Sequence, residues 1–153
     1  MNISDDGIAA IQQREGTVLT MYRDSASLPT IGTGHLLTKD ELSSGKVLAT
    51  DWKDGITPAL AEDLLKRDLA AAQAVVNAAI TVPLVQYQFD ALVSFAFNVG
   101  SMAFRQSTLA RILNAGDYLG VPAQLQRWIH SAGVVDPGLI ARRKSEIAQW
   151  ENT

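Results

Sequence analysis

The chain has 153 residues, a formal net charge of −3 and no cysteine. This length suits a single domain with a hydrophobic core, and the apolar content of 47% is that of an ordinary globular protein. The lack of cysteine excludes disulfides and cysteine-ligated metal sites. The mildly acidic balance gives no support to nucleic-acid binding, which is favoured by a basic surface.

The N-terminal residues MNISDDGIAAIQQREG contain neither the basic region nor the apolar core of a signal peptide. The weakly polar run Ala70–Leu84 is interrupted by Gln73, Asn77 and Pro83, so we expect no membrane span. These patterns predict a protein that is made soluble in the cytoplasm.

The first helix is predicted to begin at Ser4, a suitable N-cap, and to end at Glu15, just before the terminator Gly16. The spacing of Ile8 and Ile11 predicts one buried face. A carboxyl in the last helical turn meets the negative end of the helix dipole, which favours its protonated form. Glu15 is therefore in a suitable setting for a general acid.

The following segments, VLTMY and LPTIGTGHLL, are rich in β-branched residues and broken by Gly and Pro, which predicts short strands joined by tight turns. Asp24 lies at the first break and Thr30 in the second segment. Glycoside hydrolysis needs two carboxyl groups, one to protonate the leaving oxygen and one to stabilise the transition state or activate water. Without any resemblance, the alternative to a catalytic pair is chance, because a glutamate and an aspartate at this spacing occur in most soluble chains. The alternative for Thr30 is a structural role, because threonine favours β-strands.

The stretch EGTVLTMYRDSASLPTIGTGH, from Glu15 to His35, resembles the lysozymes of the phage endolysin family that includes the T4 and P22 enzymes (glycoside hydrolase family 24). The resemblance implies that Glu15 is the general acid, while Asp24 and Thr30 hold and activate water. The implied activity is that of a muramidase, which hydrolyses the β-1,4 bond between N-acetylmuramic acid and N-acetylglucosamine in peptidoglycan, with inversion. No cofactor or metal ion is implied.

The same resemblance implies an α+β, lysozyme-like fold in one domain, with the substrate cleft between two lobes. We expect an N-terminal helix and small antiparallel β-lobe over about 1–56, a long connecting helix over about 58–80, and a mainly helical lobe over about 81–153. The family also implies a monomer that waits in the host cytoplasm until a holin releases it to the cell wall. Neither nucleic-acid binding nor membrane insertion is implied.

The segment Leu36–Ile56 is polar and rich in glycine, and we interpret it as an irregular region with room for a short strand or a helical turn. Thr57 and Pro58 are typical of a helix start, and we predict one continuous helix over Pro58–Ala79. Such a helix would span about 33 Å at 1.5 Å per residue.

The segment Pro83–Gly100 is apolar nearly all round, which predicts the buried central helix of the helical lobe. Its end, F-N-V-G, resembles a family segment that lines the cleft, and this implies substrate binding by Phe97 and Asn98. Gly34 and Leu36 are assigned to the same role. The alternative for Asn98 is a helix C-cap.

Three shorter helices are predicted to follow: Leu109–Asn114 with Ser107 or Thr108 as its cap, Val121–His130, and Gly138–Trp150 with Asp136 as its cap. The last contains GLIARRKSE, which resembles the family's G-L-x-x-R-R-x-x-E signature. The resemblance implies that Arg142 or Arg143 holds Glu15 in place. A nearby cation would favour the ionised carboxylate, against the role of an acid, and the sequence leaves open which effect is larger. The alternative for both arginines is a solvated helix face.

His35 could suggest a metal ligand or a general base, but no third ligand pattern accompanies it and His130. The resemblance implies instead a structural contact with Asp68 on the long helix. In that case His35 is charged near neutral pH, and part of the stability is lost when it deprotonates at alkaline pH.

Ser27 stands in a turn where relatives usually carry glycine. Serine tolerates positive φ poorly, so we expect a turn of different shape and a small shift of Asp24.

Other functions stay open at this point. A lytic transglycosylase would need the acid but no water-holding partner, and it would leave 1,6-anhydro ends. A wall-binding or virion module with a degenerate site would keep the fold without lytic activity. A toxin secreted against competitors would share the chemistry and differ in its delivery.

Overall fold

The computed structural model describes residues 1–24, 26–43, 52 and 54–153. The chain forms two compact units. The sheet unit comprises Ile8–Asp68, and the helical unit comprises Met1–Gly7 together with Leu69–Thr153. The second boundary, between Asp68 and Leu69, lies inside the segment that the sequence predicts as the connecting helix.

The first helix, α1 (Asp5–Glu15), begins and ends as predicted. Gly7 N donates to Ser4 Oγ at 3.0 Å, which caps the helix start. Gly16 follows the last turn with φ of 74°, a left-handed conformation that glycine adopts without steric cost. Ile8 and Ile11 are buried, as their spacing predicted.

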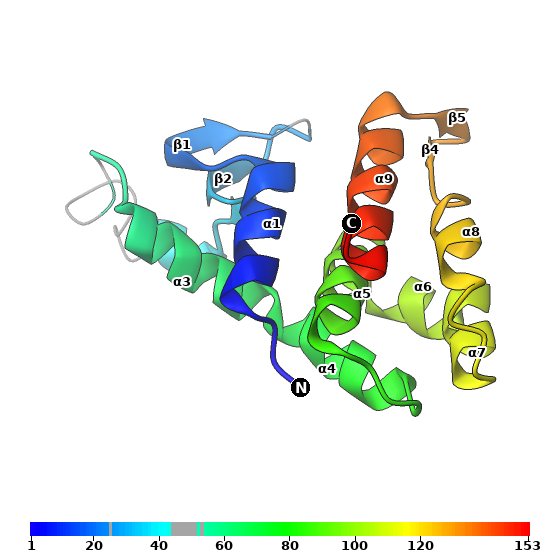
Figure 1. Ribbon diagram of the computed structural model, residues 1–153. Helices are drawn as coiled ribbons and strands as arrows, with labels where there is room; N and C mark the ends of the chain where they lie inside the picture. Colours follow the sequence, from blue (N-terminus) through cyan, green and yellow to red (C-terminus); the bar gives the residue numbers. More distant parts are fainter. Residues whose placement is uncertain (25, 44–51, 53) are drawn as a thin grey trace. The chain divides into compact units, whose positions relative to one another are not determined.

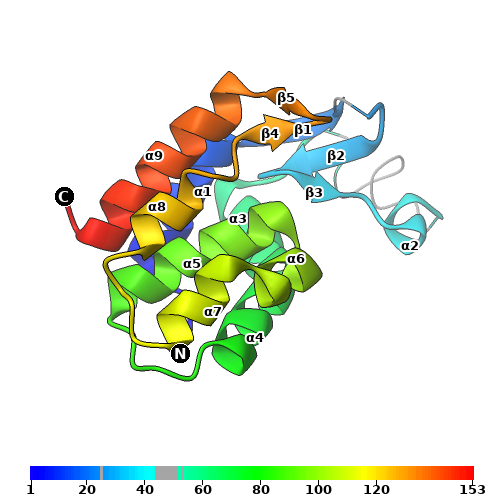
Figure 2. The same ribbon diagram turned by 90° about the vertical axis from the view of Figure 1, so that its right-hand side faces the viewer.

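The predicted short strands are confirmed. Within the described residues, β1 (Val18–Arg23), β2 (Pro29–Gly32) and β3 (His35–Leu36) form an antiparallel sheet in the order β1-β2-β3, as Figure 2 shows. Tyr22 on β1 lies opposite Thr30 on β2. The hairpin between β2 and β3 requires left-handed backbone, with φ of 73° at Gly34.

A helical turn, α2 (Lys39–Ser43), follows the sheet, as one interpretation of this region allowed. The rest of that region, residues 44–51 and 53, lies outside the described residues. The next helix, α3 (Pro58–Asp68), packs against β2, as Figure 1 shows, and also against β3. The core of this unit consists of apolar side chains from the sheet, α3 and the segment before it: Ile31, Leu37, Trp52, Ile56, Ala61 and Leu64.

The prediction of one continuous helix over Pro58–Ala79 is wrong. The helix α3 ends at Asp68, and α4 runs from Ala70 to Ala79. Between them Leu69 has φ of −73° and ψ of −14°, whereas an α-helix has ψ of about −42°. The Leu69 side chain is 0% exposed, and apolar side chains of both α3 and α4 are buried as well. The apolar pattern that predicted one helix therefore continues through the break.

The helical unit is built around α5 (Gln86–Val99), and α4, α6 (Ser101–Gln106) and α9 (Pro137–Glu151) pack against it (Figures 1 and 2). Residues 89–96 of α5 are buried, which confirms the predicted central helix. The short helix α6 was not predicted. Asp136 Oδ1 accepts a hydrogen bond from Gly138 N at 2.7 Å and caps α9, as expected.

The predicted helix over Leu109–Asn114 corresponds to α7 (Thr108–Asn114). Of the two residues proposed as its cap, Ser107 has this role, because its side chain accepts a hydrogen bond from Ala110 N at 3.0 Å.

The prediction of a helix over Val121–His130 is wrong in its second half. The helix α8 (Val121–Leu125) is short, and β4 (His130–Ser131) pairs with β5 (Val134–Val135). The two residues between these strands, Ala132 and Gly133, have φ of 49° and 80°. Positive φ at both central residues is typical of the tight turns that close β-hairpins.

Across the described ranges, no helix combines the length and the apolar composition needed to cross a membrane.

Candidate active site

Glu15 is the last residue of α1 and lies on the surface of the sheet unit. The chain turns away directly after it, because Gly16 N still donates to Gln12 O at 2.9 Å while its φ is positive. Glu15 therefore stands at a defined helix end, as the sequence predicted.

Asp24 follows β1 and is held by the turn that it begins. Its Oδ1 accepts hydrogen bonds from Ala26 N at 2.9 Å and Leu28 N at 2.8 Å. The backbone closes the same turn, since Asp24 N donates to Leu28 O at 3.0 Å. Both side-chain bonds use Oδ1, so Oδ2 is the oxygen that can accept from a water molecule or a substrate.

Ser27 adopts φ of 60°, so the expectation that serine would resist this conformation is wrong. Two hydrogen bonds hold it there. Ser27 N donates to Asp24 O at 2.9 Å, and Arg23 Nη1 donates to Ser27 O at 2.7 Å. A shift of Asp24 relative to the relatives stays a prediction.

Thr30 lies on β2 and is only 1% exposed. Its hydroxyl donates to Leu28 O at 3.0 Å. Because the single hydroxyl proton is used in this bond, the oxygen is left with acceptor capacity. A water molecule beside Thr30 would therefore be a donor to it.

Tyr22 is a further candidate for the site, which the sequence alone did not reveal. Burial raises the pKa of its phenol, and the negative charges of Asp24 and of Glu15 raise that pKa further. Both carboxylates therefore lie within electrostatic reach of one hydroxyl group. The spacing of Tyr22 and Asp24 was the signal available in the sequence. Side chains alternate along a strand, so residues two positions apart lie on the same face.

His35 is buried and lies between two carboxylates. Its Nδ1 is 2.9 Å from Asp68 Oδ2, so the predicted contact is present, and its Nε2 is 3.1 Å from Glu41 Oε2. The hydrogen bond with Asp68 raises the pKa of His35, burial opposes this, and Glu41 adds to the rise.

Glu41 was not predicted and also caps α2. Its Oε2 accepts from Thr38 N at 2.8 Å, while Glu41 N donates to Thr38 Oγ1 at 3.1 Å, which is a reciprocal capping box. Burial by itself would raise the pKa of the Glu41 carboxyl, but the hydrogen bonds from Thr38 and His35 lower it. His35 thus connects β3 to both α2 and α3.

The remaining candidates for substrate binding are accessible to different degrees. Gly34 and Leu36 are exposed in the sheet unit, while in the helical unit Phe97 is half-buried and Asn98 is exposed. The alternative that Asn98 is a helix C-cap is wrong, because Gly100 is the C-cap of α5.

Arg142 and Arg143 both bind the carboxylate of Glu146, a residue that the sequence analysis assigned no role. Arg142 Nε lies 3.1 Å from Glu146 Oε1, and Arg143 Nε lies 2.8 Å from Glu146 Oε2. Their side chains are 9% and 1% exposed, so the alternative of a solvated helix face is wrong. The glutamate that closes the G-L-x-x-R-R-x-x-E signature was the available signal. The contact of either arginine with Glu15 stays a prediction.

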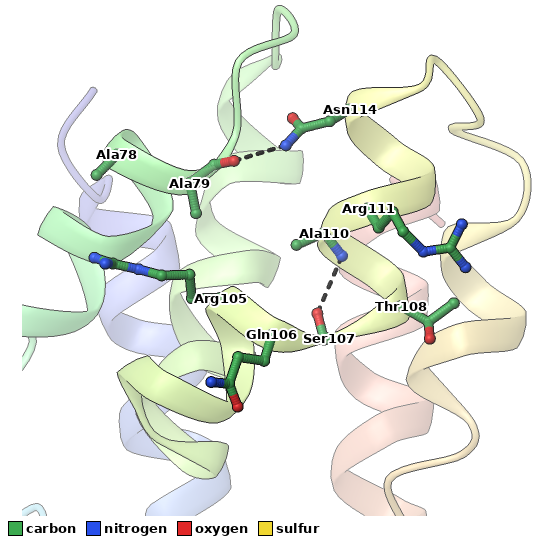
Figure 3. A pocket seen from close by; sticks show the side chains of 9 residues that line it. All are labelled: Ala78, Ala79, Arg105, Gln106, Ser107, Thr108, Ala110, Arg111 and Asn114. Atoms are coloured by element: carbon green, nitrogen blue, oxygen red, sulfur yellow. Dashed lines mark hydrogen bonds between the residues drawn. The ribbon is translucent and has the colours of Figure 1, made fainter.

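A cavity of about 500 Å³ in the helical unit, between α4, α6 and α7, contains none of these candidates. Several of its polar groups already have structural partners, since Ser107 caps α7 and Asn114 Nδ2 donates to Ala79 O at 2.7 Å. Arg105 and Arg111 extend in opposite directions from it (Figure 3). This arrangement does not converge on a ligand. In the described part of the chain, no group of three or more His, Cys, Asp or Glu residues could hold a metal ion.

Comparison with known proteins is consistent with this geometry. The chain is 38% identical to an endolysin of Acyrthosiphon pisum secondary endosymbiont phage 1, over 99% of both chains. The crystal structure of a P22 lysozyme mutant superposes with a TM-score of 0.85 at 35% identity, covering 99% of each chain. The muramidase domain of SpmX from Asticaccaulis excentricus superposes with a TM-score of 0.81 at 33% identity, covering 97% of each chain. The Phage lysozyme family matches residues 12–146, and the chain therefore belongs to the phage lysozyme family.

Proposed function

We propose that Glu15, Asp24 and Thr30 hydrolyse the β-1,4 bond between N-acetylmuramic acid and N-acetylglucosamine. Membership of the phage lysozyme family makes the chain a lysozyme-type glycosidase with a lytic, peptidoglycan-degrading function. The proposal concerns which residues carry out this reaction and how they do so.

The observation that carries the proposal is the contact of Asp24 and Thr30 with the same residue, since Leu28 N donates to Asp24 Oδ1 at 2.8 Å and Thr30 Oγ1 donates to Leu28 O at 3.0 Å. Asp24 and Glu15 come from different elements, and the charges of both raise the pKa of Tyr22. Tyr22 lies opposite Thr30 in the sheet. These relations support one site within the sheet unit that contains an acid, a second carboxylate and a hydroxyl group.

In the proposed reaction Glu15 gives its proton to the glycosidic oxygen as the bond from that oxygen to the anomeric carbon breaks. A water molecule donates to Asp24 Oδ2 and to Thr30 Oγ1, whose remaining capacity is for accepting. Its lone pair then forms the new bond to the anomeric carbon, and Asp24 takes the water proton. Attack opposite the leaving group inverts the anomeric configuration, for which the carboxyl groups should be roughly 6.5–9.5 Å apart.

Substitution of the acid is the direct test. E15Q keeps the size of the side chain and removes the transferable proton, so the rate of turbidity loss on cell walls should fall at least about a hundredfold. Circular dichroism and the melting temperature check that the variant is folded. The matched control is E62Q, which makes the same change on an exposed residue of α3 that pairs with Lys66. A folded E15Q with full lytic activity would overturn the assignment.

A lytic transglycosylase is the alternative reaction. Mass spectrometry of the released muropeptides distinguishes the two, because the transglycosylase leaves 1,6-anhydro ends and hydrolysis leaves reducing ends. Asp24 and Thr30 each keep an oxygen that can accept a hydrogen bond from water, which favours hydrolysis. Rapid NMR of the products tests the anomeric configuration, and an initial retained anomer would contradict inversion.

We also infer from the family that the protein acts as a monomer and reaches the cell wall after a holin opens the inner membrane. Sedimentation velocity measures the oligomeric state. Expression in cells with and without a holin, followed by culture density, tests the dependence on release. Lysis without a holin would contradict that route.

A further inference from the structure

The pairing of β1 with β2 changes register between the two ends of these strands. At one end Tyr22 lies opposite Thr30, and at the other end Val18 lies opposite Gly32. Between these pairs β1 contains more residues than β2, as in a β-bulge. A bulge interrupts the ladder of hydrogen bonds and bends the strand. The pairing at one end therefore does not by itself fix the position of the other end.

The proposed catalytic groups lie on both sides of this register shift. Asp24 directly follows the part of β1 that pairs with Thr30. Glu15 comes shortly before Val18, next to the other part. The residue that follows Glu15 is Gly16, and glycine restricts the backbone least of all residues. The distance from the acid to the other two groups therefore depends on how the chain just beyond Gly16 is held.

A pair of threonine hydroxyl groups holds the chain at this point. Thr17 Oγ1 and Thr33 Oγ1 lie 2.9 Å apart, so one hydroxyl donates a hydrogen bond to the other. Thr17 precedes Val18 and Thr33 follows Gly32, so the two threonines continue the register of that pair by one position. Hydrogen-bonded threonine pairs across two strands stabilise a sheet.

Burial of Thr33 makes this hydrogen bond necessary. Thr33 is 1% exposed in the turn between β2 and β3, whereas Thr17 is exposed. A buried hydroxyl group without a partner is costly, because it has lost its hydrogen bonds to water. The partner that the described part of the chain offers is Thr17 Oγ1. The buried hydroxyl therefore holds the chain close behind Glu15 against the hairpin.

The extra residues of β1 are supported by a different segment. Leu19 O accepts a hydrogen bond from Ile56 N at 2.7 Å. The chain approaches this oxygen closely, since a Cβ added to Gly55 would lie 2.9 Å from it. The register shift thus has a support of its own, and loss of the threonine pair should leave the shift in place.

We propose that Thr33 is a positioning residue which, through Thr17, fixes Glu15 relative to Asp24 and Thr30. This inference rests on the proposed function, because it concerns the placement of the same acid. A displacement of about 1 Å in a catalytic arrangement can cost on the order of a hundredfold in rate. Neither threonine is required to touch the substrate, so their effect should appear in kcat and not in KM.

Removal of either hydroxyl group is the direct test. T33V and T17V keep the shape of the side chain, and each should lower kcat for the lysis of cell walls by about tenfold or more, with KM little changed. T33S and T17S keep the hydroxyl group and should retain most of the wild-type rate. T20V is the matched control, because Thr20 is an exposed residue of β1 outside the pair.

The double variant distinguishes a bonded pair from two independent hydroxyl groups. T17V/T33V should be no slower than the slower single variant, because either substitution alone breaks the bond. Losses that add would overturn the pair. A merely structural role would lower the melting temperature of T33V and leave kcat of the folded protein unchanged, which would overturn the positioning role. If T33V does not fold, T17V decides the question, because that side chain is exposed.

The phenol of Tyr22 measures the same displacement without lytic activity. Tyr22 lies in the part of the sheet that contains Thr30, and the charge of Glu15 contributes to its raised pKa. E15Q should therefore change the pKa of Tyr22 less in the T33V protein than in the wild-type protein, because a less restrained helix end holds the charge less closely. NMR titration of labelled tyrosine measures both changes. Equal changes in the two proteins would contradict the positioning role.

The outcomes distinguish this inference from the proposed function. If wild type lyses cell walls, E15Q does not, and both T33V and T17V keep the wild-type kcat, the positioning role of Thr33 is wrong while the catalytic assignment stands. If folded E15Q lyses cell walls fully, the acid assigned in the proposed function is itself wrong.

Discussion

The imidazole of His35 and the carboxylate of Asp68 lie 2.9 Å apart, from Nδ1 to Oδ2, and this contact joins β3 to the last residue of α3. The hydrogen bond with Asp68 raises the pKa of His35 above its ordinary value. The folded state therefore binds the proton more tightly than the unfolded state does.

The pH dependence of stability follows from this direction. Below the unfolded-state pKa of His35, about 6.5, the stabilisation is fully present, and it is lost as the pH rises through the raised folded-state pKa. D68N should lower the free energy of unfolding by about 1–3 kcal/mol at pH 6, the scale of a hydrogen bond to a charged group, and by less at pH 9. Urea unfolding at both pH values measures the difference. A loss in D68N that is equal at pH 6 and pH 9 would contradict a charged histidine.

The phenol of Tyr22 reports on the two carboxylates without any need for activity. Its pKa lies above the ordinary value of 10.0, because of burial and of the charges of Asp24 and Glu15. D24N and E15Q each remove one charge, so each should lower the pKa of Tyr22, with the larger effect from D24N. NMR titration of labelled tyrosine measures this, and E62Q is the control. An unchanged Tyr22 pKa in both variants would contradict a shared site.

The left-handed backbone of Ser27 predicts opposite effects for two substitutions. This conformation costs a non-glycine residue about 1–2 kcal/mol, whereas glycine loses roughly 0.5–1 kcal/mol of extra backbone entropy on folding. S27G should therefore stabilise the fold by about 0.5–1 kcal/mol. S27V should destabilise it by about 1 kcal/mol or more, because β-branched residues are poorly tolerated at positive φ.

The same pair of variants tests how the turn positions Asp24. Strain at residue 27 would disturb the bond from Leu28 N to Asp24 Oδ1, so S27V should also lower the lytic rate. Thermal unfolding and turbidity assays measure the two effects. Equal stability of S27G and S27V would show that the turn does not require this conformation.

Local signals in the sequence determined both ends of α1, the start of α9 and the short strands of the first sheet. Ser4 and Asp136 cap their helices as predicted, because a cap bonds to backbone only two or three residues away. The spacing of Glu15, Asp24 and Thr30, together with the resemblance, also identified the family to which the chain belongs. These features depend on neighbours along the chain, which a single sequence displays directly.

Tertiary structure decided the features that depend on distant neighbours. The interruption at Leu69 is invisible to periodicity, because the apolar pattern continues through it. The orientation of Asn98 depends on Arg143, 45 positions later, and Ser94 meets Glu146, 52 positions later. No spacing rule predicts such contacts, because they arise only when α5 and α9 pack together and bury their charged groups.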